Sequence, residues 1–156
     1  IDSTLIILGR QLQGEPQQHP IEVLKRYGTL PLVECFVGPL NQVFMNILSN
    51  AIDALREAEN QVSESLKKRH SQIVIQTSVE AENAVVSIQD NGLGMAEDVR
   101  NCMFDAFFTT KPVGKGTGMG MSISYQIVTE RHQGQLLCES ELGKGTRFKI
   151  VLPLSQ

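Results

Sequence analysis

The chain has 156 residues and a formal net charge of −3 at pH 7, and its basic residues are scattered along the sequence. This length fits one domain with an ordinary hydrophobic core, which we expect to span residues 1–156. The charge gives no electrostatic reason to expect a nucleic-acid partner, and no apolar run approaches the roughly 20 residues of a membrane span.

The first third of the chain predicts one helix, two strands and the start of a second helix. Residues 1–13 are typical of a short helix, and a polar connection leads to the apolar segments IEVLKRY (21–27) and LPLVECFV (30–37). Because only two residues separate these segments, we expect a β-hairpin. Apolar residues then recur at helical spacing from Leu40, and the predicted helix runs to about Arg69 with a solvated rear half.

The rest of the chain predicts four more strands and two more helices. In chain order these are the strands QIVIQTSVE (72–80) and AVVSIQD (84–90), the helix AEDVRNCMF (96–104), a helix within MSISYQIVTERHQG (121–134), and the strands GQLLCES (134–140) and GTRFKIVLP (145–153). We therefore expect an α/β (α+β) two-layer sandwich, in which about three helices pack against a mixed, largely antiparallel sheet.

Four glycines at alternate positions mark the segment KPVGKGTGMGMS (111–122), which also carries two lysines. Glycine adopts positive φ freely and costs ordering entropy, so we expect a mobile loop that runs into a helix N-terminus. Such an end favours a phosphate, and a plain flexible turn explains the spacing equally well. The P-loop motif and the dinucleotide fingerprint are both absent. We expect Phe104, Phe107 and Phe108 to pin the base of this loop to the core.

Asn46 and Asn50 lie on one face of the long predicted helix, because they are four residues apart. An amide carbonyl oxygen suits Mg²⁺, which usually arrives with phosphates and few protein ligands. For this pair alone, helix capping or a hydrogen bond between elements is the better interpretation.

Asp90 ends a predicted strand and precedes an Asn-Gly turn, which lets the carboxylate point from the sheet edge into a pocket. As an acceptor it could hold an amino group such as that of adenine. Taken alone, a turn-forming aspartate is at least as good an interpretation.

Taken together and in this order, five segments resemble the sequence boxes of the catalytic, ATP-binding domain of sensor histidine kinases, in the Bergerat-fold ATPase family. The match covers nearly the whole chain, and five ordered boxes are far more specific than any single one. The N box corresponds to NQVFMNILSNAIDAL (41–55), and the F box corresponds to FDAFFTTK (104–111). The first, second and last glycine boxes correspond to DNGLGM (90–95), GKGTGMGMS (114–122) and GKGTRF (143–148). The resemblance implies a Bergerat-type ATP-binding fold.

For the nucleotide base, the resemblance implies that Asp90 accepts a hydrogen bond from the adenine amino group, helped by Thr146. Gly92 and Gly94 would shape the base pocket, and Met95 belongs to the same box. ATP is therefore the implied nucleotide.

For the phosphates, the resemblance implies that Asn46 and Asn50 handle Mg²⁺ and the triphosphate, with Asn46 as the metal ligand. Asp53 lies in the same box, and we expect it to contact the nucleotide as well. The lid that closes over the phosphates would contain Lys111, Lys115, Gly116, Thr117, Gly118, Met119, Gly120 and Met121. Two of these, Met119 and Met121, replace leucines common in the family, a volume-conserving change that should be tolerated.

No histidine of the chain lies in the sequence setting of a phosphoacceptor helix, which in this family belongs to a preceding dimerisation domain. The resemblance therefore implies two partners: the histidine-bearing dimerisation domain of the same polypeptide and the receiver domain of a response regulator.

Related ATPases that hydrolyse ATP carry a glutamate one helical turn before the second N-box asparagine, where it activates water. That position is Asn46 here, and Gln42 is no better as a base. We therefore expect an external imidazole to attack the γ-phosphate. Two alternatives stay open: an ATP-hydrolysing conformational switch of the gyrase or chaperone type, and a nucleotide-binding module without transfer.

The cysteines and the first residues predict the compartment. Cys35, Cys102 and Cys138 are odd in number and far apart, so we interpret them as buried thiols in a reducing compartment. The start of the chain lacks a basic region and a cleavage site. We expect a soluble, cytoplasmic piece without direct membrane contact.

Overall fold

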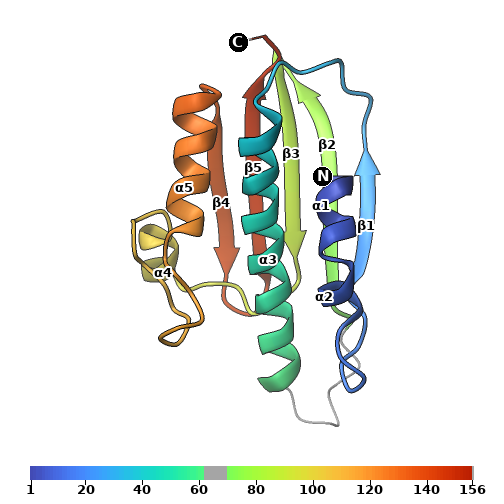
Figure 1. Ribbon diagram of the computed structural model, residues 1–156, viewed down its shortest axis with the longest axis vertical. Coiled ribbons are helices and arrows are strands. Elements are labelled where there is room, and N and C mark those ends of the chain that lie inside the picture. Colours follow the sequence, from blue (N-terminus) through green and yellow to red (C-terminus); the bar gives the residue numbers. More distant parts are fainter. Residues whose placement is uncertain (62–69, 156) are drawn as a thin grey trace.

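A computed structural model describes residues 1–61 and 70–155, and its centre is one five-stranded sheet (Figure 1). The strands are β1 (Glu22–Tyr27), β2 (Gln72–Glu80), β3 (Asn83–Asp90), β4 (Gln135–Glu141) and β5 (Gly145–Pro153). Their order across the sheet is β1-β2-β3-β5-β4. β1 pairs with β2 in parallel, and the other three pairs are antiparallel. The mixed, largely antiparallel sheet is therefore confirmed.

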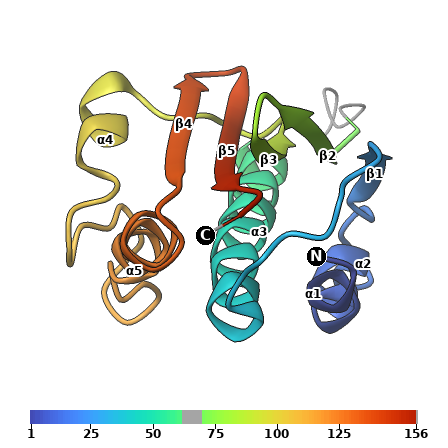
Figure 2. The same ribbon diagram turned by 90° about the horizontal axis from the view of Figure 1, so that it is seen from above.

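One layer of helices covers a single face of this sheet, and a further short helix, α4 (Glu97–Cys102), lies beside its β4 edge (Figure 2). The helices of the layer are α1 (Asp2–Ile7), α2 (Gly9–Gln13), α3 (Val37–Gln61) and α5 (Gly120–Gln126), and a turn of π-helix, η2 (Ile127–Arg131), continues α5. α3 runs along the middle of the sheet, with α1 and α2 on one side of it and α5 on the other. This arrangement confirms the predicted two-layer sandwich.

The apolar stripe of α3 holds the two layers together. Side chains that recur every three or four residues form a face that is removed from water against the sheet. They join one core cluster with inward-facing strand residues such as Ile75, Ile88 and Ile150, each no more than 1% exposed. The buried residues of α3 are Leu40, Val43, Phe44, Ile47, Leu48, Ala51, Ile52 and Leu55. The polar side chains of α3 therefore lie beside this stripe.

The segment 30–37 is not a strand, and the predicted hairpin with β1 is wrong. Residues 28–36 run without regular secondary structure from β1 to the start of α3. Pro31 has no N–H for a strand ladder, and β1 pairs instead with β2, which comes after α3 in the chain. The Phe36 N–H donates to Nε2 of the buried His132 at 3.0 Å, so this segment is fixed against the end of η2.

The structure also differs from the sequence predictions in where two helices begin or divide and in how far the cysteines are buried. The helix predicted at 1–13 is divided into α1 and α2, and α3 begins at Val37 rather than Leu40. The predicted continuation of α3 into 62–69 lies outside the described residues. The three cysteines are free but half-buried rather than buried. Among the described residues, none of the helices combines the length and the hydropathy that a bilayer crossing requires.

Candidate functional site

Asn46 connects α3 to the first turn of α5. Its Nδ2 donates to the backbone carbonyl of Gly120 and to Oγ of Ser124, each at 3.0 Å. Ser124 is fully buried and itself donates to the Gly120 carbonyl at 2.8 Å. The amide nitrogen therefore makes hydrogen bonds between elements, as the asparagine pair taken alone predicts. These bonds do not involve Oδ1 of Asn46, which a cation would require.

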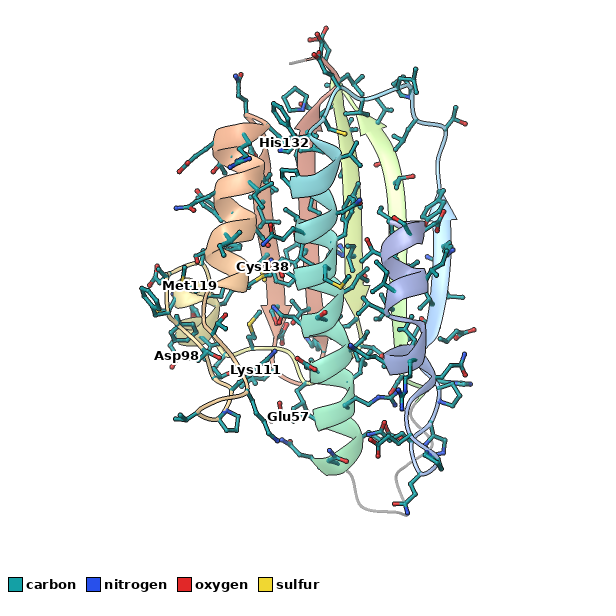
Figure 3. The ribbon with its side chains drawn as sticks, viewed as in Figure 1. Glu57, Asp98, Lys111, Met119, His132 and Cys138 are labelled. Carbon is teal, nitrogen blue, oxygen red and sulfur yellow. The ribbon has the colours of Figure 1, made fainter. Side chains whose placement is uncertain are left out.

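Lys111 connects the loop before α5 to the middle of α3 (Figure 3). Its Nζ lies 2.5 Å from Oδ2 of Asp53 and 3.4 Å from Oδ1 of Asn50. The Asp53 side chain is 54% exposed, so solvent screens this ion pair and its contribution to stability is small. Because Asn46, Asn50 and Asp53 follow one another at helical spacing, α3 presents a row of polar side chains beside a lysine.

Asp90 is the last residue of β3, and it is only 4% exposed. Its Oδ1 accepts a hydrogen bond from the backbone N–H of Gly92 at 2.8 Å. Burial raises the pKa of Asp90 to about 6, while the backbone N–H groups of Gly92 and Thr146 oppose this rise by stabilising the carboxylate. Thr146 faces Asp90 across the β3–β5 ladder. At neutral pH the site therefore holds a buried anionic acceptor.

Ser140, on β4, is a member of this site that the sequence analysis missed. Its Oγ lies 2.8 Å from the backbone nitrogen of Met95, 2.8 Å from Oγ1 of Thr146 and 3.1 Å from the Gly145 carbonyl oxygen. A lone serine belongs to no motif. The available signal was its place on the inward-facing side of the predicted strand, two residues after Cys138.

Glycines allow the loops around Asp90 to approach one another closely. Gly94 and Gly145 have φ of +70° and +91°; a Cβ at Gly94 would overlap the Glu141 carbonyl, and one at Gly145 the Asp90 carbonyl. At Gly92 a Cβ would lie 2.9 Å from Oδ1 of Asp90 and 3.2 Å from the backbone of α3. A Cβ at any of the three positions would come too close to a neighbouring atom, so the close approach of these loops depends on glycine.

The other predicted lid residues differ in where they lie. The side chains of Lys115 and Thr117 are exposed, and Oγ1 of Thr117 accepts a local hydrogen bond from the Met119 N–H at 3.2 Å. Met121 is buried in the core. Of the predicted lid, the structure brings Lys111 and Gly120 to α3.

Phe107 does not pin the loop to the core, which corrects that prediction. Its side chain is 75% exposed, and its φ of +66° is unusual for a bulky residue. Phe104 does pack against the core, with its ring centroid 5.1 Å from that of Tyr125, and Phe108 is half-buried. A Cβ at Gly118 would overlap the Phe107 carbonyl, so the loop closes on itself backbone against backbone.

Replacing Gly118 with alanine should loosen this loop far more than replacing Gly114. Both glycines have positive φ, +67° and +86°, but a Cβ at Gly114 meets nothing within 4 Å. Gly114→Ala should therefore cost about 1 kcal/mol of local stability, and Gly118→Ala at least about 2. Amide hydrogen exchange of residues 105–119 measures the difference, and equal rates in the two variants would contradict the close packing at Gly118.

Two cavities of the described surface have neither Asp90 nor Asn46 in their lining. One, of about 360 Å³, lies beside the N-terminus next to Tyr27, and the other, of about 250 Å³, lies between α3 and α5 next to Gln42. Within residues 1–61 and 70–155, no three His, Cys, Asp or Glu side chains gather as they would around a metal ion. A metal at Asn46 would therefore take its remaining ligands from the nucleotide and water.

Comparison with known proteins places the chain in a family. The family model described as "Histidine kinase-, DNA gyrase B-, and HSP90-like ATPase" matches residues 37–156. Sporulation kinase E of Bacillus subtilis (strain 168) is 38% identical over 127 residues, which cover 81% of this chain and 15% of that protein. Sensor kinase CckA of Brucella abortus (strain 2308) is 39% identical over 127 residues, covering 78% and 13%. The chain thus spans less than a fifth of the length of these relatives.

Solved structures share the fold. The nucleotide-free catalytic domain of histidine kinase ThkA has a TM-score of 0.77 at 23% identity, covering 99% of this chain and 92% of that one. Full-length ShkA in complex with AMPPNP has a TM-score of 0.77 at 21% identity, covering 97% and 28%. The Bergerat-type fold is therefore confirmed. Because the family model also covers most of the sequence, the chain belongs to the histidine kinase-, DNA gyrase B- and HSP90-like ATPases.

Proposed function

We propose that this domain binds Mg-ATP and transfers the γ-phosphoryl group to a histidine on a separate dimerisation domain, as the catalytic part of a two-component sensor kinase. The observation that carries the proposal is the closeness of two unlike groups of residues. Gly92, which binds the buried Asp90 carboxylate, lies against Ala54 of α3, the neighbour of Asp53 in the polar row. One bound molecule with an amino-bearing base and a phosphate chain would contact both groups.

At the base end, Asp90 would accept a hydrogen bond from the adenine amino group, with Thr146 beside it. The buried, ionised carboxylate supports this role, because a buried acceptor gains most from a matching donor. Gly92, Gly94 and Met95 would form the wall of the base pocket. The tight backbone approach at Gly92 and Gly94 supports this assignment, since a side chain at either position would displace the Asp90 carboxylate or the Glu141 backbone.

At the phosphate end, Oδ1 of Asn46 would hold Mg²⁺, and Asn50, Asp53 and Lys111 would lie along the triphosphate. When bound there, Mg²⁺ would offset the negative charge that develops during transfer. Lys111 would exchange Asp53 for a phosphate oxygen as the loop closes. The residues proposed to line the closed lid with it are Lys115, Gly116, Thr117, Gly118, Met119, Gly120 and Met121.

The nucleophile would come from outside residues 1–156, which we propose act as one ATP-binding domain. Asn46 and Gln42 are neutral amides, which cannot take a proton from an attacking water molecule. The proposed partners are the dimerisation domain of the same polypeptide and a response-regulator receiver domain, in the cytoplasm, without nucleic acid or direct membrane contact by this domain. Alignment and charge neutralisation would then supply most of the catalysis.

Incubation with γ-labelled Mg-ATP tests this proposal. The chain is assayed with and without the histidine-bearing domain of its parent polypeptide, and acid-labile protein phosphate and free phosphate are followed together. We expect label on the added domain only, with little free phosphate. Free phosphate without labelled protein would contradict the proposal in favour of a hydrolase, and nucleotide binding without either product would leave a binding module.

A further inference from the structure

The hydroxyl of Ser140 lies among three polar groups whose hydrogen-bonding capacities are fixed or limited. The Met95 backbone nitrogen can only donate, and the Gly145 carbonyl oxygen can only accept. The third group, the Thr146 hydroxyl, can do either, and it lies 2.8 Å from Oγ of Ser140. A serine hydroxyl offers one hydrogen and two lone pairs. The direction of the Ser140–Thr146 bond therefore follows from the other two groups.

Only one arrangement satisfies all three contacts at once. Ser140 accepts from the Met95 N–H at 2.8 Å and donates its single hydrogen to the Gly145 carbonyl at 3.1 Å. Its second lone pair then accepts the hydrogen of Thr146. The reverse direction would turn the Ser140 hydrogen away from the Gly145 carbonyl oxygen and would make one hydrogen bond fewer.

We infer that Ser140 is a positioning residue that fixes the Thr146 hydroxyl as a hydrogen-bond acceptor, and thereby selects a purine that carries an amino group over one that carries an oxo group. Once its hydrogen is bound to Ser140, Thr146 has only lone pairs left for a ligand. Thr146 faces Asp90 across the β-ladder, so two acceptors lie at the same end of the sheet. This inference rests on the proposed function and deepens it.

The selectivity follows from matching donors to acceptors. The 6-amino group of adenine offers N–H donors to such a pair, whereas the 6-oxo group of guanine or hypoxanthine places an acceptor against two acceptors. Without the Ser140 hydroxyl, the Thr146 hydroxyl is free to rotate and can donate to an oxo group. The Asp90 carboxylate remains, so discrimination should weaken rather than disappear.

Competition binding of ATP and ITP to the chain and to Ser140→Ala tests the inference. We expect the ratio of the two dissociation constants to shift about fivefold to tenfold toward ITP, the effect of one hydrogen bond. Ser140→Thr, which keeps a hydroxyl, should retain the original ratio. If Ser140 acts only as structural support, Ser140→Ala will weaken both nucleotides equally, and that result would overturn the inference.

A double-mutant cycle shows whether the effect passes through Thr146. In Thr146→Val, which keeps the shape but lacks the hydroxyl, adding Ser140→Ala should no longer change the ratio. An unchanged Ser140→Ala effect in that background would also overturn the inference.

Should Ser140→Ala fail to fold, Ser140→Cys provides a similar volume with a weak hydrogen-bonding group, and the ratio should still shift toward ITP. Absence of ATP binding by the unaltered chain would instead contradict the proposed function itself.

Discussion

Replacing Asp90 with asparagine is expected to stabilise the protein at neutral pH while weakening ATP binding about tenfold or more. Burial raises the pKa of this carboxyl from 3.8 to about 6, which corresponds to a cost of about 3 kcal/mol for holding it ionised in the folded state. Asparagine keeps an oxygen for the Gly92 N–H but carries no charge. Because its amide nitrogen must also find a partner, we expect a gain on the order of 1–3 kcal/mol.

The pH dependence gives the sign of this effect. Because the folded pKa lies above the unfolded one, this carboxyl contributes stability that is present below about 3.8 and lost as pH rises through about 6. The advantage of Asp90→Asn in the free energy of unfolding should therefore be largest above pH 6 and small at pH 4. Urea unfolding of both proteins at pH 7.5 and pH 4 measures it. An equal difference at the two pH values would contradict the desolvated carboxylate.

ATP binding should respond in the opposite direction. With Oδ1 bound to the Gly92 N–H, the substitution puts an NH₂ group in place of Oδ2, and a donor then faces the amino group of adenine. ATP affinity of the unaltered protein should likewise fall as the pH drops below about 6, because protonation removes the acceptor. The matched control is Asp98→Asn on α4, an exposed aspartate, which should change neither stability by more than about 0.5 kcal/mol nor ATP affinity.

The elements that the sequence predicts correctly are those with a local signal. The apolar stripe of α3 repeats over many turns, and the β2–β3 pair is joined by a short turn, so periodicity and neighbouring residues suffice. The apolar run at 30–37 carries no such local signal, because a continuous apolar segment is equally compatible with a strand and with a buried connection. Its true contact, from Phe36 to His132, joins residues that are distant in the sequence.

The same distinction separates the parts of the site. The motifs identify Asp90 and the asparagines of α3, but not which atoms they use. Lys111 contacts Asp53, which is 58 residues away in the sequence, and Ser140 contacts Met95, which is 45 residues away. Contacts of this kind depend on how the layers pack. The exposure of Phe107 could not be predicted either, because its left-handed backbone is set by the loop around Gly118.

Replacing Asn46 with alanine is expected to lower Mg²⁺-dependent phosphoryl transfer at least about a hundredfold. The substitution removes Oδ1, the proposed Mg²⁺ ligand. The protein would then no longer hold Mg²⁺ in position beside the phosphates. It also removes both hydrogen bonds from Nδ2 to the first turn of α5. Transfer to the histidine-bearing domain, measured across a range of Mg²⁺ concentrations, tests this expectation.

Ser124→Ala separates the two roles of Asn46, because both side-chain hydrogen bonds of Ser124 among the described residues belong to the connection between α3 and α5. Its removal deletes one hydrogen bond from Nδ2 and one to the Gly120 carbonyl, and it leaves Oδ1 of Asn46 in place. If Asn46 binds the metal, Ser124→Ala should retain most of the transfer activity and the original Mg²⁺ dependence, while Asn46→Ala loses both. Equal losses in the two variants, with unchanged Mg²⁺ dependence, would show instead that Asn46 acts by anchoring α5.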